Sequence, residues 1–254
     1  MNKIMGFFIL FFSLISCTSK PVLTPLDAED EFARAKLYFE NKKYDGAAQA
    51  FERIIFFYPS SEFVDDAQYW LGRSYFEKKD YDQAIIEFDY LIRNFKNSSF
   101  FEETYLYRAK AYILKAPNYT KDQTELVAAL GLLDEYLTMF PNSSSTNEVK
   151  DLIRVGRDRL AKKEVENGKL YMKLNYSRAA FLYFDYVLET YPETEASSEA
   201  KYYKAKLYEK RGELDAALNL YKELLDTNNW KEKAEKRIKE IEKRIKKENP
   251  SDAG

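Results

Sequence analysis

Few residues in this sequence are able to carry chemistry. The chain has no histidine and one cysteine, Cys17, which excludes Ser-His-Asp and Cys-His catalysis, imidazole proton transfer and most zinc sites. The sequence contains no Gly-rich phosphate loop, and its carboxylates fall among similar numbers of lysines, as on a solvated helix surface. We therefore expect a protein without catalytic residues, cofactor or metal, in which Cys17 is the one reactive side chain.

Cys17 closes an N-terminal segment with the features of a secretion signal. An almost wholly apolar run follows Lys3 and extends over residues 4–16. Thirteen helical residues rise only about 20 Å, too short for the ~30 Å hydrocarbon core of a membrane. The sequence Leu14-Ile15-Ser16-Cys17 resembles the bacterial lipobox, which predicts a lipoprotein signal peptide over residues 1–16 and acylation of Cys17. An ordinary signal peptide with a chance cysteine is the alternative.

The lipobox resemblance also implies a location. Two or more acyl chains anchor a protein stably, since each buried CH₂ contributes about 0.8 kcal/mol. Thr18 follows the cysteine, whereas an aspartate there retains lipoproteins at the inner membrane in many Gram-negative bacteria. The expected location is therefore the outer membrane, on its periplasmic face. Residues 17–27 contain two prolines and no helical pattern, which is typical of a short tether.

The body of the chain repeats every 37 residues, as the spacing of Tyr38, Tyr75 and Tyr112 shows. A small residue is followed by tyrosine three positions on, alanine nine after that, then an aromatic residue and a closing proline. This order resembles the tetratricopeptide repeat, a helical hairpin. The composition agrees, since 45% hydrophobic residues with only 8 Gly and 7 Pro argue against disorder and against a strand-rich fold. The net charge of −2 leaves no general attraction to nucleic acid.

The repeats predict an all-α tetratricopeptide superhelix of about five helical hairpins. A hairpin leaves one apolar face uncovered, so stacking has to bury it, and the abundant aromatic residues are expected to form that core. Where the two helices of a hairpin approach most closely, only small side chains fit, and the expected positions are Ala35, Gly72, Ala109, Gly168 and Ala205.

The spacing also predicts the organisation of the chain. Five repeats occupy residues 28–228, with an N-terminal lobe over 28–144 and a C-terminal lobe over 175–228. Residues 145–174 hold a connector helix (Thr146 to Lys173) and the start of repeat four, and the stretch between the two helices of the third repeat, Lys115 to Thr124, is eight residues longer than the matching loops. A charged helix and tail over 229–254 carry an apolar stripe that favours capping of the last repeat; docking on anionic lipid or a partner is the alternative.

The order of these pieces resembles the BamD family of outer-membrane lipoproteins. The resemblance spans about residues 28–225 and, besides the lipobox, rests on Tyr58 to Gln68, Asp122-Gln123-Thr124, Phe140-Pro141-Asn142-Ser143 and Arg157 to Glu164. It implies a scaffold of the β-barrel assembly machinery, not an enzyme. Its implied partners are the periplasmic domains of an Omp85-type barrel insertase and unfolded outer-membrane β-barrel proteins, whose last strand ends in an aromatic residue and a free carboxylate.

A basic column is expected on the concave side of the superhelix. The residue after each small position is basic in all five repeats: Lys36, Arg73, Lys110, Lys169 and Lys206. In the first three repeats these cations have large apolar neighbours three residues later or four residues earlier, namely Phe32, Phe39, Tyr69, Phe76, Leu106 and Ile113. Cations between apolar side chains suit an extended segment with a terminal carboxylate. Ordinary solvated lysines are the alternative.

The family resemblance further implies an insertase-docking surface around repeat four. Relatives carry Asn-Arg in the second helix of this repeat, where the present chain has Leu182-Tyr183; the docking residues expected are Lys169, Tyr183 and Lys206. Tetratricopeptide lipoproteins that take up glycans or coordinate the envelope at peptidoglycan are the alternative. They normally carry a long sugar-binding insertion or an N-terminal coiled coil, and neither pattern is present in this sequence.

Overall fold

A computed structural model describes residues 26–248, so Cys17, the signal peptide and most of the tether lie outside the described residues. Helices make up all the regular secondary structure of the described range, which confirms the predicted all-α fold class. The helices are α1 Ala28–Glu40, α2 Tyr44–Phe57, α3 Val64–Glu77, α4 Tyr81–Asn94, α5 Phe101–Lys115, α6 Thr124–Met139, α7 Thr146–Lys173, α8 Ser177–Thr190, α9 Glu195–Arg211, α10 Leu214–Glu223 and α11 Lys231–Glu248.

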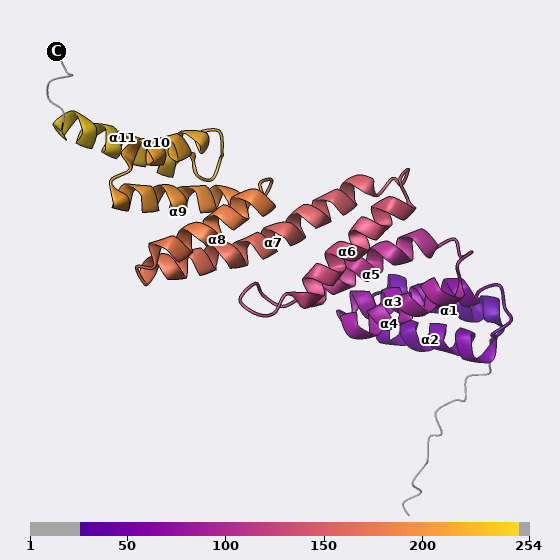
Figure 1. Ribbon diagram of the computed structural model, residues 1–254. Coiled ribbons are helices and arrows are strands. Elements are labelled where there is room, and N and C mark those ends of the chain that lie inside the picture. The colour runs from indigo at the N-terminus through magenta and orange to yellow at the C-terminus, as the bar shows by residue number, and fades with distance from the viewer. Residues whose placement is uncertain (1–25, 249–254) are drawn as a thin grey trace, which may run out of the picture.

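The helices pair into five antiparallel hairpins that stack into an elongated superhelix, from α1 and α2 at one end to α10 and α11 at the other (Figure 1). Consecutive helices pack against each other along the whole series, both within a hairpin and from one hairpin to the next. The first core cluster, for example, joins Phe51 of α2 to Leu71 of α3, and the next joins Phe88 of α4 to Phe101 of α5. Stacking thus buries the apolar face that each hairpin exposes, as predicted for tetratricopeptide repeats.

Two of the hairpins close on a glycine that lies under a phenylalanine ring. A Cβ added to Gly72 would lie 2.5 Å from the ring of Phe88, and one added to Gly168 would lie 2.5 Å from the ring of Phe184. Both rings are fully buried. Because any side chain larger than hydrogen would collide with the ring, the small residues expected at the helix crossing are required there.

The long helix α7 holds the enlarged loop of the third repeat. Loop 116–123 has eight residues, against three in loop 78–80 of repeat two, so the loop is five residues longer instead of the predicted eight, and the longer helices α5 and α6 account for the rest. Arg159 of α7 donates hydrogen bonds from Nη2 to the carbonyls of Ala116 (3.0 Å) and Pro117 (2.8 Å). The loop is therefore attached to the connector by charge-assisted hydrogen bonds.

Two neighbouring residues attach the same stretch of α7 to the C-terminal lobe. Arg157 donates from Nη2 to the carbonyl of Thr190 at the end of α8 (2.6 Å), and Asp158 accepts from the backbone N–H of Ala196 at the start of α9 (2.8 Å). Three consecutive side chains thus tie α7 to the loop of repeat three on one side and to α8 and α9 on the other, which gives the Arg157–Glu164 segment a structural role.

The C-terminal helix α11 covers the last hairpin. Ala234 and Ile241 are fully buried, and Ile238 and Ile245 pack against the same cluster, which includes Tyr221 of α10. Its apolar stripe is thus occupied by the core. Within residues 26–248, none of the helices has the length and apolar character needed to cross a membrane.

Candidate interaction surfaces

The cations of the basic column lie in two ladders in which they alternate with aromatic rings. In the first ladder, Nζ of Lys36 lies 3.1 Å from the ring centre of Trp70, and Cζ of Arg73 lies 5.7 Å from the same ring. Arg73 then lies 3.8 Å from the ring centre of Tyr107, and Nζ of Lys110 is 4.7 Å from that ring. The column therefore joins consecutive repeats by cation–π contacts, each contributing about 0.5–2 kcal/mol.

The second ladder is shorter and lies beyond the connector. Lys169 and Lys206 share the ring of Tyr203, with Nζ at 5.0 and 5.7 Å from its centre. Lys169 also contacts Glu166 (2.6 Å) and Glu199 (3.0 Å). The column thus divides into a three-repeat part and a two-repeat part.

Carboxylates pair with the cations of the first ladder. Arg73 contacts Glu77 (3.1 Å) and Glu103 (3.6 Å), and Lys110 contacts Glu148 (2.6 Å). The three glutamates are much more exposed than the cations that they neutralise. An incoming carboxylate would therefore replace an exposed glutamate instead of binding an unpaired cation.

Burial and neighbouring groups shift the pKa of the ladder cations in different directions. Burial lowers the pKa of Lys36; Glu40 partly offsets this, and Arg73 adds to it. Burial alone would also lower the pKa of Arg73, but Tyr69, which accepts a hydrogen bond from it, and Tyr107 outweigh that effect and raise its pKa. Arg73 is thus the more firmly held charge of the two.

Three of the residues predicted to flank the cations do not reach the surface. Tyr69, Leu106 and Ile113 are at most 7% exposed, so the prediction that they line a groove is corrected. Position four before the cation faces the next hairpin, and there Tyr69 stacks on Phe100 with ring centres 4.2 Å apart. These side chains support the ladder from beneath.

The remaining predicted flanking residues are partly exposed and lie beside the ladder. Phe39 meets the edge of Trp70 (4.9 Å) and Phe76 that of Tyr107 (5.1 Å), while Phe32 packs between Phe51 and Phe63 at the start of the superhelix. The rings that lie closest to the cations, Trp70 and Tyr107, are not among the predicted residues. The predicted Phe39 and Tyr69 lie farther away, with ring centres 5.8 Å from Arg73. Trp70 and Tyr107 stand three residues before a basic position, a spacing that the sequence shows.

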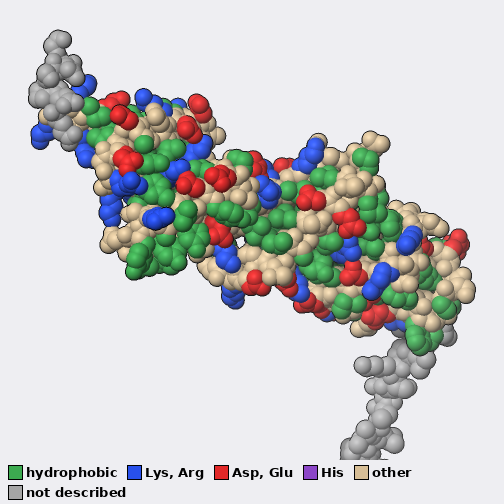
Figure 2. Space-filling view, in the orientation of Figure 1, with side chains coloured by type: hydrophobic (Ala, Val, Ile, Leu, Met, Phe, Trp, Pro, Cys, Tyr) green, Lys and Arg blue, Asp and Glu red, His purple; other side chains and the backbone are tan. Residues whose placement is uncertain are grey.

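A second surface lies on the α7–α8 hairpin and is apolar. Leu182 is 66% exposed, and large side chains are exposed around it: Leu170, Leu174, Tyr176 and Tyr186. Two shallow hollows of about 530 and 560 Å³ adjoin here and share Tyr171, Ala179 and Leu182 in their walls. Figure 2 shows hydrophobic side chains gathered at this end of the hairpin, at the lower left of the molecule. We call it the α7–α8 patch.

The predicted docking residues divide between the two surfaces. Tyr183 belongs to the α7–α8 patch, where its ring stacks on Tyr171 at 5.3 Å and 15°. Lys169 precedes Tyr171 by two residues and therefore points to the opposite side of α7, where it shares Tyr203 with Lys206. The expectation of one docking surface containing all three residues is corrected.

Comparison with known proteins fits this architecture. The family model YfiO, described as "Outer membrane lipoprotein", matches residues 26–224, nearly all of the described chain. The chain belongs to this family. A curated relative, "Outer membrane protein assembly factor BamD" of Rickettsia prowazekii, is 25% identical over 166 residues, which are 65% of this chain and 66% of that protein. The match spans just under two thirds of the relative's length, and the predicted BamD resemblance is confirmed.

Solved structures of tetratricopeptide repeat proteins are also similar. One, from Thermus thermophilus, shares 19% identity over 84% of this chain and 98% of its own, with a TM-score of 0.38. Another, from Parabacteroides merdae, shares 14% identity over 84% of this chain and 72% of its own, also with a TM-score of 0.38.

Proposed function

We propose that this YfiO-family lipoprotein is a non-catalytic scaffold of outer-membrane β-barrel assembly, held at the periplasmic face of the membrane by acyl chains on Cys17. The curated relative is named an outer membrane protein assembly factor, and the stacked hairpins offer extended surfaces of the kind that repeat proteins use for binding.

The observation that carries the proposal is the α7–α8 patch. Exposed apolar patches of this kind mark protein interaction sites. Aromatic side chains are enriched among the residues that contribute most of the binding energy of such interfaces. Leu182, Tyr183 and Tyr186 come from one face of α8, and Tyr171 supports them from α7. The patch is the docking site that we assign to the periplasmic domains of an Omp85-type insertase.

The first ladder is the site that we assign to unfolded barrel substrates. Arg73 and Lys110 lie between aromatic rings, and their glutamate partners are exposed. The C-terminal carboxylate of a barrel strand takes the place of Glu103 or Glu148, while its final aromatic side chain packs against Phe76 or Phe39.

Affinity purification from detergent-solubilised native envelopes tests the docking site. We expect the unmodified chain to recover an Omp85-type barrel and a Leu182→Glu, Tyr186→Glu variant to lose about tenfold or more of it, because charges enter the apolar centre. Ile86→Glu with Tyr90→Glu is the matched control, since these exposed residues hold the equivalent positions on α4. Equal recovery by both variants contradicts the docking site; recovery of a glycan porin or peptidoglycan instead supports the alternative lipoprotein classes.

Peptide binding tests the substrate site. We expect Arg73→Gln and Phe76→Ala each to weaken binding of a C-terminal barrel-strand peptide, by about tenfold for Arg73→Gln, because a charged hydrogen bond is lost. Arg108→Gln is the control, as Arg108 also stacks on a tyrosine and pairs with Asp89, but lies outside the ladder. Unchanged binding by the first two variants ends this assignment.

A further inference from the structure

Two aromatic side chains are exposed at the end of the first hairpin and have no role in the surfaces described above. Phe56 is 78% exposed and Phe57 is 64% exposed, on the last turn of α2. Their rings meet edge to face, with centres 4.9 Å apart. Exposing two neighbouring phenylalanines to water is unfavourable, so this position requires an apolar partner in the working protein.

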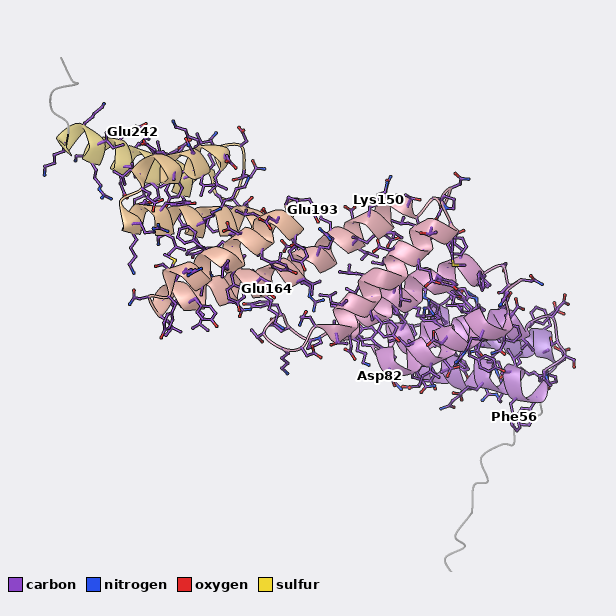
Figure 3. The ribbon with its side chains drawn as sticks, viewed as in Figure 1. Phe56, Asp82, Lys150, Glu164, Glu193 and Glu242 are labelled. Carbon is purple, nitrogen blue, oxygen red and sulfur yellow. The ribbon has the colours of Figure 1, made fainter. Side chains whose placement is uncertain are left out.

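The place of the pair in the fold says which partner that is. Tyr58, the next residue, donates a hydrogen bond from its hydroxyl to the carbonyl of Leu26, the first described residue. The beginning of α1 and the end of α2 therefore lie at the same end of the hairpin. Figure 3 shows Phe56 beside the point at which the described chain begins.

The length of the preceding chain brings this end close to the membrane. Leu26 follows Cys17 by only nine positions, and nine extended residue steps span at most about 30 Å. A lipid anchor on Cys17, which belongs to the proposed function, therefore keeps the aromatic pair within about 30 Å of the bilayer. Any conformation of these residues that is less than fully extended brings the pair closer to the membrane surface.

We infer that Phe56 and Phe57 form a second membrane contact, inserting into the phospholipid surface beneath the acyl anchor. Large aromatic side chains on a helix end enter the headgroup and upper acyl region to a depth of about 5–10 Å. Asp27, Glu29 and Asp30 open α1 at the same end, and Arg53 is paired with Glu31. Insertion is therefore driven by the apolar rings, and its partner is zwitterionic lipid. This contact fixes the orientation of the first hairpin on the membrane, which acyl chains alone leave free.

Site-specific fluorescence in proteoliposomes tests this inference. The lipidated full chain has no free thiol once Cys17 is acylated, so Phe56→Cys gives one labelling site for the environment-sensitive dye NBD. Vesicles of phosphatidylethanolamine and phosphatidylcholine, with and without nitroxide-labelled lipid, report depth. We expect quenching of the label at position 56 to exceed that at two controls by about twofold or more. The controls are Gln49→Cys, two turns earlier on α2, and Val127→Cys, exposed on α6.

Flotation of the same vesicles separates the inference from the proposed anchor. If the protein floats and the label at position 56 is quenched no more than the controls, the aromatic pair stays out of the bilayer and the inference is wrong, while the anchor stands. If the protein does not float, the anchor on Cys17 is wrong and the inference falls with it. A Phe56→Ser, Phe57→Cys variant that loses the extra quenching, while still floating, shows that the neighbouring ring is needed.

Discussion

Repeats two (α3–α4) and four (α7–α8) close on the same contact, a buried phenylalanine against a glycine, Phe88 on Gly72 and Phe184 on Gly168. Their outer faces differ. In the second helix of repeat two, Glu87 stands three residues after the small residue Ala84, and its carboxylate accepts a hydrogen bond from Nε2 of Gln68 (2.7 Å). At the equivalent position repeat four has Tyr183.

This difference separates the contacts that hold the superhelix together from the side chains that are available for binding a partner. In repeat two a buried glutamine and a glutamate satisfy each other, so the outer face of α4 has a polar network beside its exposed side chains. In repeat four Tyr183 stacks on Tyr171 and leaves an apolar surface that no other helix within residues 26–248 covers. The hairpin joint is a requirement of folding, and the outer face can change without disturbing it.

The glycine–phenylalanine contacts that close the two hairpins, which we call the hairpin joints, give the largest expected effect on stability. Phe88→Ala and Phe184→Ala should each lower the free energy of unfolding by about 3–5 kcal/mol, because each leaves a cavity over a glycine that cannot fill it. Phe57→Ala, which removes an exposed ring, should change it by less than about 0.5 kcal/mol. Urea denaturation measures the free energy of unfolding of all three variants. A cost for Phe184→Ala less than half that for Phe88→Ala shows that the two joints are not equivalent.

The outer faces give the next largest difference. Glu87→Ala should cost about 1–2 kcal/mol, because the buried amide of Gln68 loses its carboxylate partner. Tyr183→Ala should cost about 0.5–1.5 kcal/mol, because it removes one partly exposed ring stack. A double-mutant cycle with Gln68→Ala isolates the polar contact. If the cycle gives no coupling energy between Glu87 and Gln68, the polar network does not stabilise repeat two and the contrast between the two outer faces is wrong.

The joints could be predicted from the sequence, and the surfaces only in part. A glycine or alanine every 37 residues, with an aromatic residue at a fixed distance, specifies a helix crossing because the crossing has one geometry. The cations at the next position were likewise found from spacing. Their ring partners Trp70, Tyr107 and Tyr203 follow from the same period, three residues before a cation.

What the period does not specify is which apolar side chains are covered. Tyr69 and Leu106 share the spacing expected of a groove but are buried, because the following hairpin packs on them. Leu182 and Tyr186 have the pattern of core side chains in the sequence but are exposed, because none of the described helices packs on that face of α8. Coverage depends on the stacking of neighbouring hairpins, and the extended third repeat and the connector change that stacking between the lobes.

Acidification should act on the two repeats in opposite directions. In repeat four, burial alone would raise the pKa of Glu166, but its contacts with Lys169 and Lys162 outweigh burial and lower it. In repeat two, burial raises the pKa of Asp66, and the charge of Asp65 adds to this. A carboxyl group whose pKa is lower in the folded state than in the unfolded state stabilises the fold at pH values above the unfolded-state pKa, and this stabilisation is lost as the pH falls through the folded-state pKa. A carboxyl group whose pKa is raised in the folded state destabilises the fold at neutral pH instead.

Two isosteric variants measure this contrast. Glu166→Gln should destabilise the protein at about pH 7, and this effect should shrink as the pH falls through the lowered folded-state pKa of Glu166. Asp66→Asn should stabilise the protein at about pH 7, and this effect should largely vanish at about pH 3, where the carboxyl group of Asp66 is mostly protonated in the folded and the unfolded state. Urea denaturation at both pH values gives the differences. Effects of the same sign at neutral pH contradict the assignment of opposite environments to these two carboxylates.

The smallest difference concerns the turn between the two helices of each repeat. Lys79 in repeat two (φ 67°) and Asn175 in repeat four (φ 64°) both adopt the left-handed conformation. This costs an ordinary residue about 1–2 kcal/mol, and asparagine less, while glycine adds about 0.5–1 kcal/mol of unfolded-chain entropy. Lys79→Gly should therefore raise the free energy of unfolding by about 0.5 kcal/mol.

Asn175→Gly should leave stability unchanged or lower it slightly, since it also loses the hydrogen bond from Lys210 Nζ to Asn175 Oδ1 (2.6 Å). Thermal denaturation of the two variants, compared with Gly212→Ala at the equivalent turn of repeat five (φ 80°), puts the three turns on one scale. The alanine variant should be destabilised by about 1 kcal/mol, because no side chain lies near enough to obstruct its Cβ and only backbone strain remains. Equal gains for Lys79→Gly and Asn175→Gly would mean that the asparagine relieves no strain, and that repeat four tolerates its turn through the packing of Tyr171 and Tyr176 instead.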